Sequence, residues 1–112
     1  RGNEKVSHRY DFCNPAVIRL IDHTAKRAEK GKIQIGMCGG MAGDPLAIPL
    51  LIGMGFDELS MASTSIVKAK YITSKVGKSN CQKLRDEVLK CRDAKEIRHI
   101  LNEFYHEYIG VI

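Results

Sequence analysis

Two short apolar segments, each followed by a helical pattern, set narrow limits on the fold of this chain. Residues 33–37 carry β-branched side chains in a period-two pattern, and both they and residues 56–61 are predicted to be short strands. Strands that alternate with helices are typical of βαβ units and a parallel sheet. Two strands cannot form a parallel sheet that is covered on both faces. We therefore expect the chain either to borrow strands, from the rest of its polypeptide or from a second copy, or to fold poorly alone.

The first helical signals follow residue 13. Asn14 can cap a helix, Pro15 suits its first position, and apolar residues at helical spacing continue to Gly31. A second helical pattern covers residues 46–54. Pro49 lies inside it, so the regular helix is expected to begin later than the preceding Asp-Pro pair.

Three further helical patterns complete the chain. Ser63 or Thr64 is expected to cap a helix that ends at Gly77. Apolar stripes then predict two more helices, over residues 81–91 and 94–108.

Composition excludes several classes of protein. The 112 residues are too few for a two-domain enzyme, and they carry a formal net charge of +5. The basic excess lies between Lys68 and Arg92, where Tyr71 is the one aromatic residue, so a solvated surface is favoured and no nucleic-acid partner is expected. Because no long apolar run or export signal is present, we expect no membrane association and a cytoplasmic location.

Residues 36–44, Gly-Met-Cys-Gly-Gly-Met-Ala-Gly-Asp, join a predicted strand to a helix. Loops at the carboxyl ends of strands meet substrate in βα folds, and glycines let backbone N–H groups approach an anion. The spacing does not match a nucleotide-binding motif. A buried cysteine is the ordinary interpretation for Cys13, Cys81 and Cys91, whereas Cys38 is either a small core residue or an acid, base or nucleophile. No zinc-site spacing is present, and all four are expected to be reduced thiols.

Residues 35–72, with the motifs GMCGGMAGD and LLIGMGFDELSMASTSI, closely resemble the C-terminal phosphoenolpyruvate-binding domain of enzyme I of the bacterial phosphotransferase system. The opening RGNEKVSH and the helix start NPAVIRLI match the same family in register. The resemblance implies an α/β fold, the C-terminal part of a (β/α)₈ TIM barrel. Residues 1–112 would form a single partial domain holding the last two strands and their helices, with residues 79–112 as a C-terminal helical extension.

The resemblance also implies roles for two residues. Cys38 matches the acid that protonates the enolate carbon when phosphoenolpyruvate loses its phosphoryl group, and Arg1 matches a ligand of the substrate phosphate. The residues that hold Mg²⁺ in the family lie upstream of Arg1, so no metal ligand is expected here. Gly40 departs from the family, which commonly has glutamate at this position. We expect this difference to affect the efficiency of the reaction and not its type.

The function implied is a phosphotransferase of sugar transport. It would transfer the phosphoryl group of phosphoenolpyruvate to its own histidine and then to the histidine-containing phosphocarrier protein, through an N-terminal domain absent here. A homodimer is implied, and the chain by itself is expected to be inactive. The alternatives are a relative of pyruvate phosphate dikinase or phosphoenolpyruvate synthase, and a non-catalytic, truncated dimerisation fragment.

Overall fold

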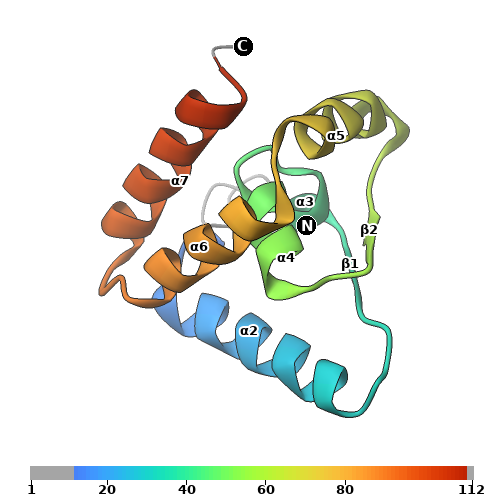
Figure 1. Cartoon of the computed structure of the whole chain (residues 1–112), viewed down its shortest axis with the longest axis vertical. Helices are drawn as coiled ribbons and strands as arrows, with labels where there is room; N and C mark the ends of the chain where they lie inside the picture. Colours follow the sequence, from blue (N-terminus) through green and yellow to red (C-terminus); the bar gives the residue numbers. More distant parts are fainter. Residues whose placement is uncertain (1–11, 111–112) are drawn as a thin grey trace, which may run out of the picture.

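The computed structural model describes residues 12–110 as six helices and two strands that follow one another closely (Figure 1). In chain order they are α2 (Pro15–Lys30), β1 (Gly36–Cys38), α3 (Gly40–Gly43), α4 (Ala47–Met54), β2 (Glu58–Ser60), α5 (Ser63–Lys75), α6 (Lys78–Leu89) and α7 (Ala94–Tyr108). None of the helices in this part of the chain is long and apolar enough to cross a bilayer.

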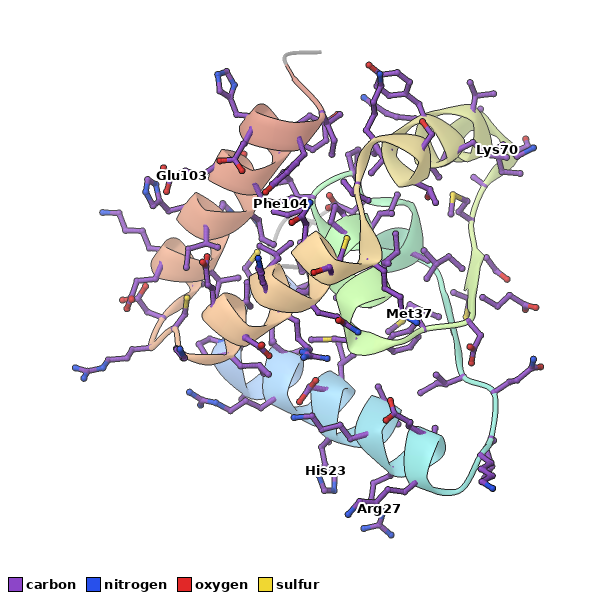
Figure 2. The ribbon with its side chains drawn as sticks, viewed as in Figure 1. His23, Arg27, Met37, Lys70, Glu103 and Phe104 are labelled. Atoms are coloured by element: carbon purple, nitrogen blue, oxygen red, sulfur yellow. The ribbon has the colours of Figure 1, made fainter. Side chains whose placement is uncertain are left out.

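Helix α2 forms as its sequence predicts. The Asn14 side chain accepts a hydrogen bond from the Ala16 N–H at 2.9 Å, and Pro15 takes the first helical position. Ile18 and Ala25 are buried, while His23 and Arg27 extend from the outer side of the helix (Figure 2). The amphipathic pattern therefore places one face of α2 on the core.

The two strands pair in parallel, which confirms the predicted βαβ arrangement. The register aligns Gly36 with Glu58, Met37 with Leu59, and Cys38 with Ser60. Both strands are shorter than expected, and the prediction for residues 33–35 is wrong. Just before β1, the two segments are joined instead through Asp57. Its carboxylate accepts a hydrogen bond from the Ile35 N–H at 2.9 Å, and its own N–H donates to the Ile35 carbonyl at 2.8 Å.

Helix α4 begins at Ala47, after the Asp-Pro pair, as Pro49 predicts. The Asp44 carboxylate accepts from the Leu46 N–H at 3.0 Å, and its carbonyl accepts from the Ala47 N–H at 2.9 Å. Pro49 lies in the first turn, where an N–H would have no intrahelical partner. The short helix α3, between the glycine-rich segment and Asp44, is a feature that the sequence did not predict.

Helix α5 corrects one expected cap. It begins at Ser63, and the residue before it, Ala62, adopts the extended N-cap conformation with no side-chain hydrogen bond. Ser63 and Thr64 therefore lie inside the first turn rather than ahead of it. The predicted helix over 94–108 is confirmed as α7, which Asp93 caps by accepting from the Glu96 N–H at 2.9 Å.

Helix α4 lies at the centre of the core, with α2 and α6 packed against it (Figure 1). Seven of its eight residues are buried. It crosses α6 at Gly53, where a Cβ would lie 2.6 Å from the Cys81 carbonyl carbon and closer still to its oxygen. Only glycine fits that crossing. A second, smaller core cluster forms around Ile48 and Ile72, between α4 and α5.

Candidate functional site

The carboxyl ends of both strands meet at the glycine-rich segment. Met37 and Leu59 are half-buried against the core, and Met37 lies between β1 and α4 (Figure 2). Because side chains alternate along a strand, the next residues, Cys38 and Ser60, lie on the opposite face, where both are exposed. The thiol and the hydroxyl are therefore register partners at the end of the sheet.

The backbone turns sharply directly after Cys38. Gly39 has φ 90° and ψ −161°, a conformation that L side chains rarely adopt, and α3 begins at the next residue. Met41 and Ala42 are buried and anchor this helix to the core. A Cβ on Gly43 would lie 3.3 Å from the Ser65 hydroxyl, so α3 packs closely on the start of α5.

An open cavity of about 500 Å³ lies beside this turn. Its walls come from α3, the end of β2 and the start of α5, and the residues that line it are Gly39, Gly40, Gly43, Ser60, Met61, Ala62 and Ser65. The N-terminal end of α5, which has no side-chain cap, also lies here. None of the residues that line this cavity carries a carboxylate.

Cys38 differs from the other three cysteines in its surroundings. All four are reduced, and Cys38 alone is exposed. Burial raises the pKa of the Cys81 thiol to about 11, and it also raises the pKa of Cys91, with a further contribution from the Glu96 carboxylate. The prediction that Cys13, Cys81 and Cys91 are core residues is confirmed. Cys38 is the thiol that a substrate can reach.

The other predicted site residue, Arg1, lies outside the described residues. Within residues 12–110, no cluster of three His, Cys, Asp or Glu side chains could hold a metal ion. His23, His99 and His106 are exposed on helices, and His99 Nε2 lies 2.9 Å from a Glu103 carboxylate oxygen one turn away. Of the two predicted site residues, the structure therefore describes Cys38 alone.

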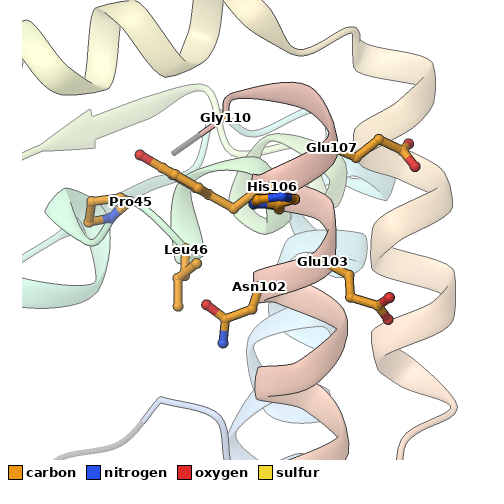
Figure 3. Close-up of a pocket in the computed structure, with 8 residues that line it drawn as sticks. Pro45, Leu46, Asn102, Glu103, His106, Glu107 and Gly110 are labelled. Atoms are coloured by element: carbon orange, nitrogen blue, oxygen red, sulfur yellow. The ribbon is translucent and has the colours of Figure 1, made fainter. Parts of the chain in front are cut away.

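A larger cavity, of about 800 Å³, lies between the segment before α4 and the end of α7 (Figure 3). Asn102 and His106 face Leu46 there, whereas Glu103 and Glu107 point away from it (Figure 3). The sequence did not indicate this cavity. It contains neither Cys38 nor any other residue of the glycine-rich turn, so it forms no part of the predicted site.

Sequence comparison agrees with the geometry of the turn. Residues 1–77 match the family described as "PEP-utilising enzyme, PEP-binding domain". The match covers more than half of the chain, and the chain therefore belongs to the family of phosphoenolpyruvate-utilising enzymes.

The relatives are more specific in name. The chain is 42% identical to the phosphoenolpyruvate-protein phosphotransferase of Mycoplasma pneumoniae over 94% of its own length and 18% of that protein. It is 40% identical to the enzyme of the same name from Bacillus subtilis, over 94% of the chain and 18% of the relative, and 45% identical to that of Buchnera aphidicola, over 93% and 18%. The chain thus spans about a fifth of the length of these relatives.

Proposed function

We propose that this chain is the C-terminal part of a phosphoenolpyruvate-protein phosphotransferase, in which Cys38 is the proton donor. The observation that carries the proposal is the position of Cys38. It is the exposed thiol of the four, and it stands at the carboxyl end of a parallel strand in a family of phosphoenolpyruvate-utilising enzymes. The names of the relatives favour a phosphotransferase over a dikinase or a synthase.

The chemistry needs an acid of this kind. When phosphoenolpyruvate loses its phosphoryl group to a histidine, the enolate of pyruvate remains, and its methylene carbon must gain a proton. The Cys38 S–H bond breaks as the new C–H bond forms, which gives pyruvate and a thiolate. A thiol is mostly protonated at neutral pH, yet it is a far stronger acid than a hydroxyl group.

The other parts of the reaction are assigned to Arg1 and to the rest of the longer polypeptide. Arg1 would bind the substrate phosphate, because a guanidinium offers paired donors to phosphate oxygens. The described residues contain no metal-ligand cluster, so they do not fit a magnesium site, and we derive no step through Mg²⁺ on this chain. The histidine, the metal ligands and the surface for the histidine-containing phosphocarrier protein would lie upstream, in a homodimeric enzyme.

The barrel belongs to the same proposal. Among the described residues each strand pairs only with the other, so each leaves one edge unpaired. Between the end of β2 and α5, an open cavity of about 520 Å³ is lined largely by apolar atoms, from Leu59, Met61, Ile66 and Ala69 among others. A neighbouring strand and helix from the missing part would cover that surface.

Ile66→Ser tests the barrel. In the 112-residue chain Ile66 is 41% exposed, so the substitution should cost about 1.5 kcal/mol. In the longer polypeptide the side chain becomes fully buried, and the cost should reach about 2.5 kcal/mol. Val67→Ser is the control, because Val67 is 78% exposed and does not line that cavity. Equal costs of Ile66→Ser in the two proteins, measured by urea unfolding, would contradict the barrel.

Cys38→Ala in the longer polypeptide tests the proton donor. Phosphoenolpyruvate should still bind, while pyruvate formation in a coupled assay should fall by about 10²-fold or more. Cys91→Ala, which removes a buried thiol, is the matched control and should leave pyruvate formation unchanged. Undiminished turnover by Cys38→Ala would refute the assignment.

The isolated chain provides a separate test. Because the proposed phosphoryl acceptor and metal ligands lie outside it, the 112-residue protein should release no pyruvate from phosphoenolpyruvate and Mg²⁺. Magnesium-dependent release of pyruvate from it would show that the chemistry is contained within these residues.

A further inference from the structure

Ser60 stands beside Cys38 through the pairing of the strands rather than through the sequence. The two residues lie 22 positions apart, and the parallel register makes them direct neighbours. Neighbouring strands are spaced at about 4.8 Å, so side chains on the same face of adjacent strands come within contact distance. Both side chains are exposed, and Ser60 also lines the cavity next to the glycine turn.

We propose that Ser60 is a positioning residue for Cys38, whose hydroxyl donates a hydrogen bond to the sulfur and stabilises the thiolate that proton transfer leaves behind. The inference rests on the proposed function, and it adds to that function a second residue. During the reaction the Cys38 proton goes to carbon and the electron pair of the S–H bond stays on sulfur. Ser60 keeps its own proton throughout, and water returns a proton to the thiolate.

The described residues offer few other partners for the sulfur. Met37 and Leu59 point to the core. Within the described residues, neither the Cys38 nor the Ser60 side chain makes a hydrogen bond. Ser65 lines the same cavity but packs against α3, where a Cβ on Gly43 would approach its hydroxyl to 3.3 Å.

Among residues 12–110, the charged groups near the turn do not supply a donor. Glu58, on the same face of β2 as Ser60 and two residues before it, carries an acceptor and opposes a thiolate. Asp44, after α3, is also acidic, and its carboxylate already accepts from the Leu46 N–H at 3.0 Å. The nearest lysines of α5, Lys68 and Lys70, follow its first turn and are exposed. A neutral hydroxyl on the neighbouring strand is therefore the group in place to donate.

Alkylation of Cys38 by iodoacetamide tests this directly in the 112-residue chain, with the modified peptide quantified by mass spectrometry. A hydrogen bond to a charged acceptor changes the thiolate population roughly tenfold. A thiolate held this way is also less nucleophilic, by about the square root of that factor. Ser60→Ala should therefore slow alkylation about threefold at pH 7 and accelerate it under strongly alkaline conditions, where the nucleophilicity of the thiolate alone sets the rate.

Matched variants separate this role from a merely structural one. Ser60→Thr keeps the hydroxyl and should retain the wild-type profile, and Ser65→Ala, in the same cavity, should leave it unchanged. Protection of Cys13, Cys81 and Cys91 from the reagent verifies that each variant is folded. An identical pH profile for Ser60→Ala and the wild type would overturn the inference.

Turnover in the longer polypeptide distinguishes this inference from the proposed function. Ser60→Ala should lower kcat severalfold with little change in KM, because the hydroxyl acts on the thiol and not on the bound substrate. If Cys38→Ala abolishes turnover but Ser60→Ala alters neither kcat nor the alkylation profile, the inference about Ser60 fails alone. If Cys38→Ala turns over normally, the proposed function fails.

Discussion

Replacing Gly53 with alanine is the sharpest test of the packing that supports the site. At this position the backbones of α4 and α6 touch, and a Cβ would lie 2.6 Å from the Cys81 carbonyl carbon and 3.2 Å from the Gln82 nitrogen. Because the opposing atoms are backbone, no side-chain rotation can relieve the clash. The two helices must move apart.

The magnitude follows from three effects. Overpacking costs typically 1–3 kcal/mol, and a backbone contact should fall at the upper end of about 3 kcal/mol. The movement also weakens the hydrogen bond that Arg85 Nη1 donates to the Gly53 carbonyl at 2.9 Å, for about 1 kcal/mol more. Alanine regains about 1 kcal/mol through its helix propensity. The net loss is roughly 3 kcal/mol of unfolding free energy, or about 10 °C in Tm for a domain of this size.

Urea unfolding followed by circular dichroism measures this loss, provided that the slope of the transition is unchanged. Gly31→Ala is the control, because Gly31 has φ −82°, and its Cβ would lie 3.3 Å from the movable end of the Ile33 side chain and at ordinary contact distance, 3.6 Å, from the Arg27 carbonyl oxygen. That variant should be neutral or stabilised by up to about 1 kcal/mol. A Gly53→Ala protein as stable as the wild type would refute the argument for a backbone contact.

Three other predictions concern buried or half-buried polar groups. Asp22 is buried, with Oδ2 paired to Lys26 at 2.9 Å and Oδ1 without a partner. Asp22→Leu should therefore leave the unfolding free energy unchanged or raise it by up to about 1 kcal/mol in urea unfolding. A loss above about 2 kcal/mol would contradict this prediction. Arg85→Lys should destabilise the chain by about 1 kcal/mol, because an ammonium cannot reproduce both the bond to the Gly53 carbonyl and the contact with Asp86; an unchanged urea midpoint would disprove this. Burial raises the Cys81 pKa from 9.0 to about 11, so above pH 9 the unfolded chain loses this proton while the folded chain keeps it. Stability should therefore fall between pH 9 and 11 by up to about 2–3 kcal/mol, and a Cys81→Ala variant that keeps the full slope would assign the loss to other groups.

Local signals predicted the elements whose causes are local. Asn14 and Pro15 start α2 because their side chains act on adjacent backbone, and Pro49 delays α4 for the same reason. The burial of Cys13, Cys81 and Cys91 also followed from their places in the pattern, whereas the pattern left open whether Cys38 is a core residue, and the structure shows it exposed. Residues 33–35 failed as a strand because pairing depends on a partner, and the Asp57 carboxylate occupies that place.

The features that the sequence could not predict depend on contacts between distant residues. Asp22 looks like a solvent-facing helix residue until the packing of α2 buries it. No residue near Gly53 in the sequence indicates that it contacts the Cys81 backbone. Ser60 becomes a neighbour of Cys38 only through the register of the two strands. Two of these three features, the contact at Gly53 and the register of Ser60, support or surround the proposed site. The thiol of that site can be predicted from a sequence motif, but its surroundings cannot.

The position of Cys38 depends on α4, the helix that Gly53 holds against α6. The turn after the thiol leads through α3 to Asp44, whose side chain and carbonyl hold the start of α4, while Gly53 fixes the far end of α4 against α6. A displaced α4 would therefore move the thiol relative to substrate, and misplacements of about 1 Å can cost 10²-fold in rate. Gly53→Ala should lower turnover in the longer polypeptide under conditions in which it remains folded, whereas Asp22→Leu, which does not move α4, should not. On the proposed function, the core around α4 would support catalysis as well as stability.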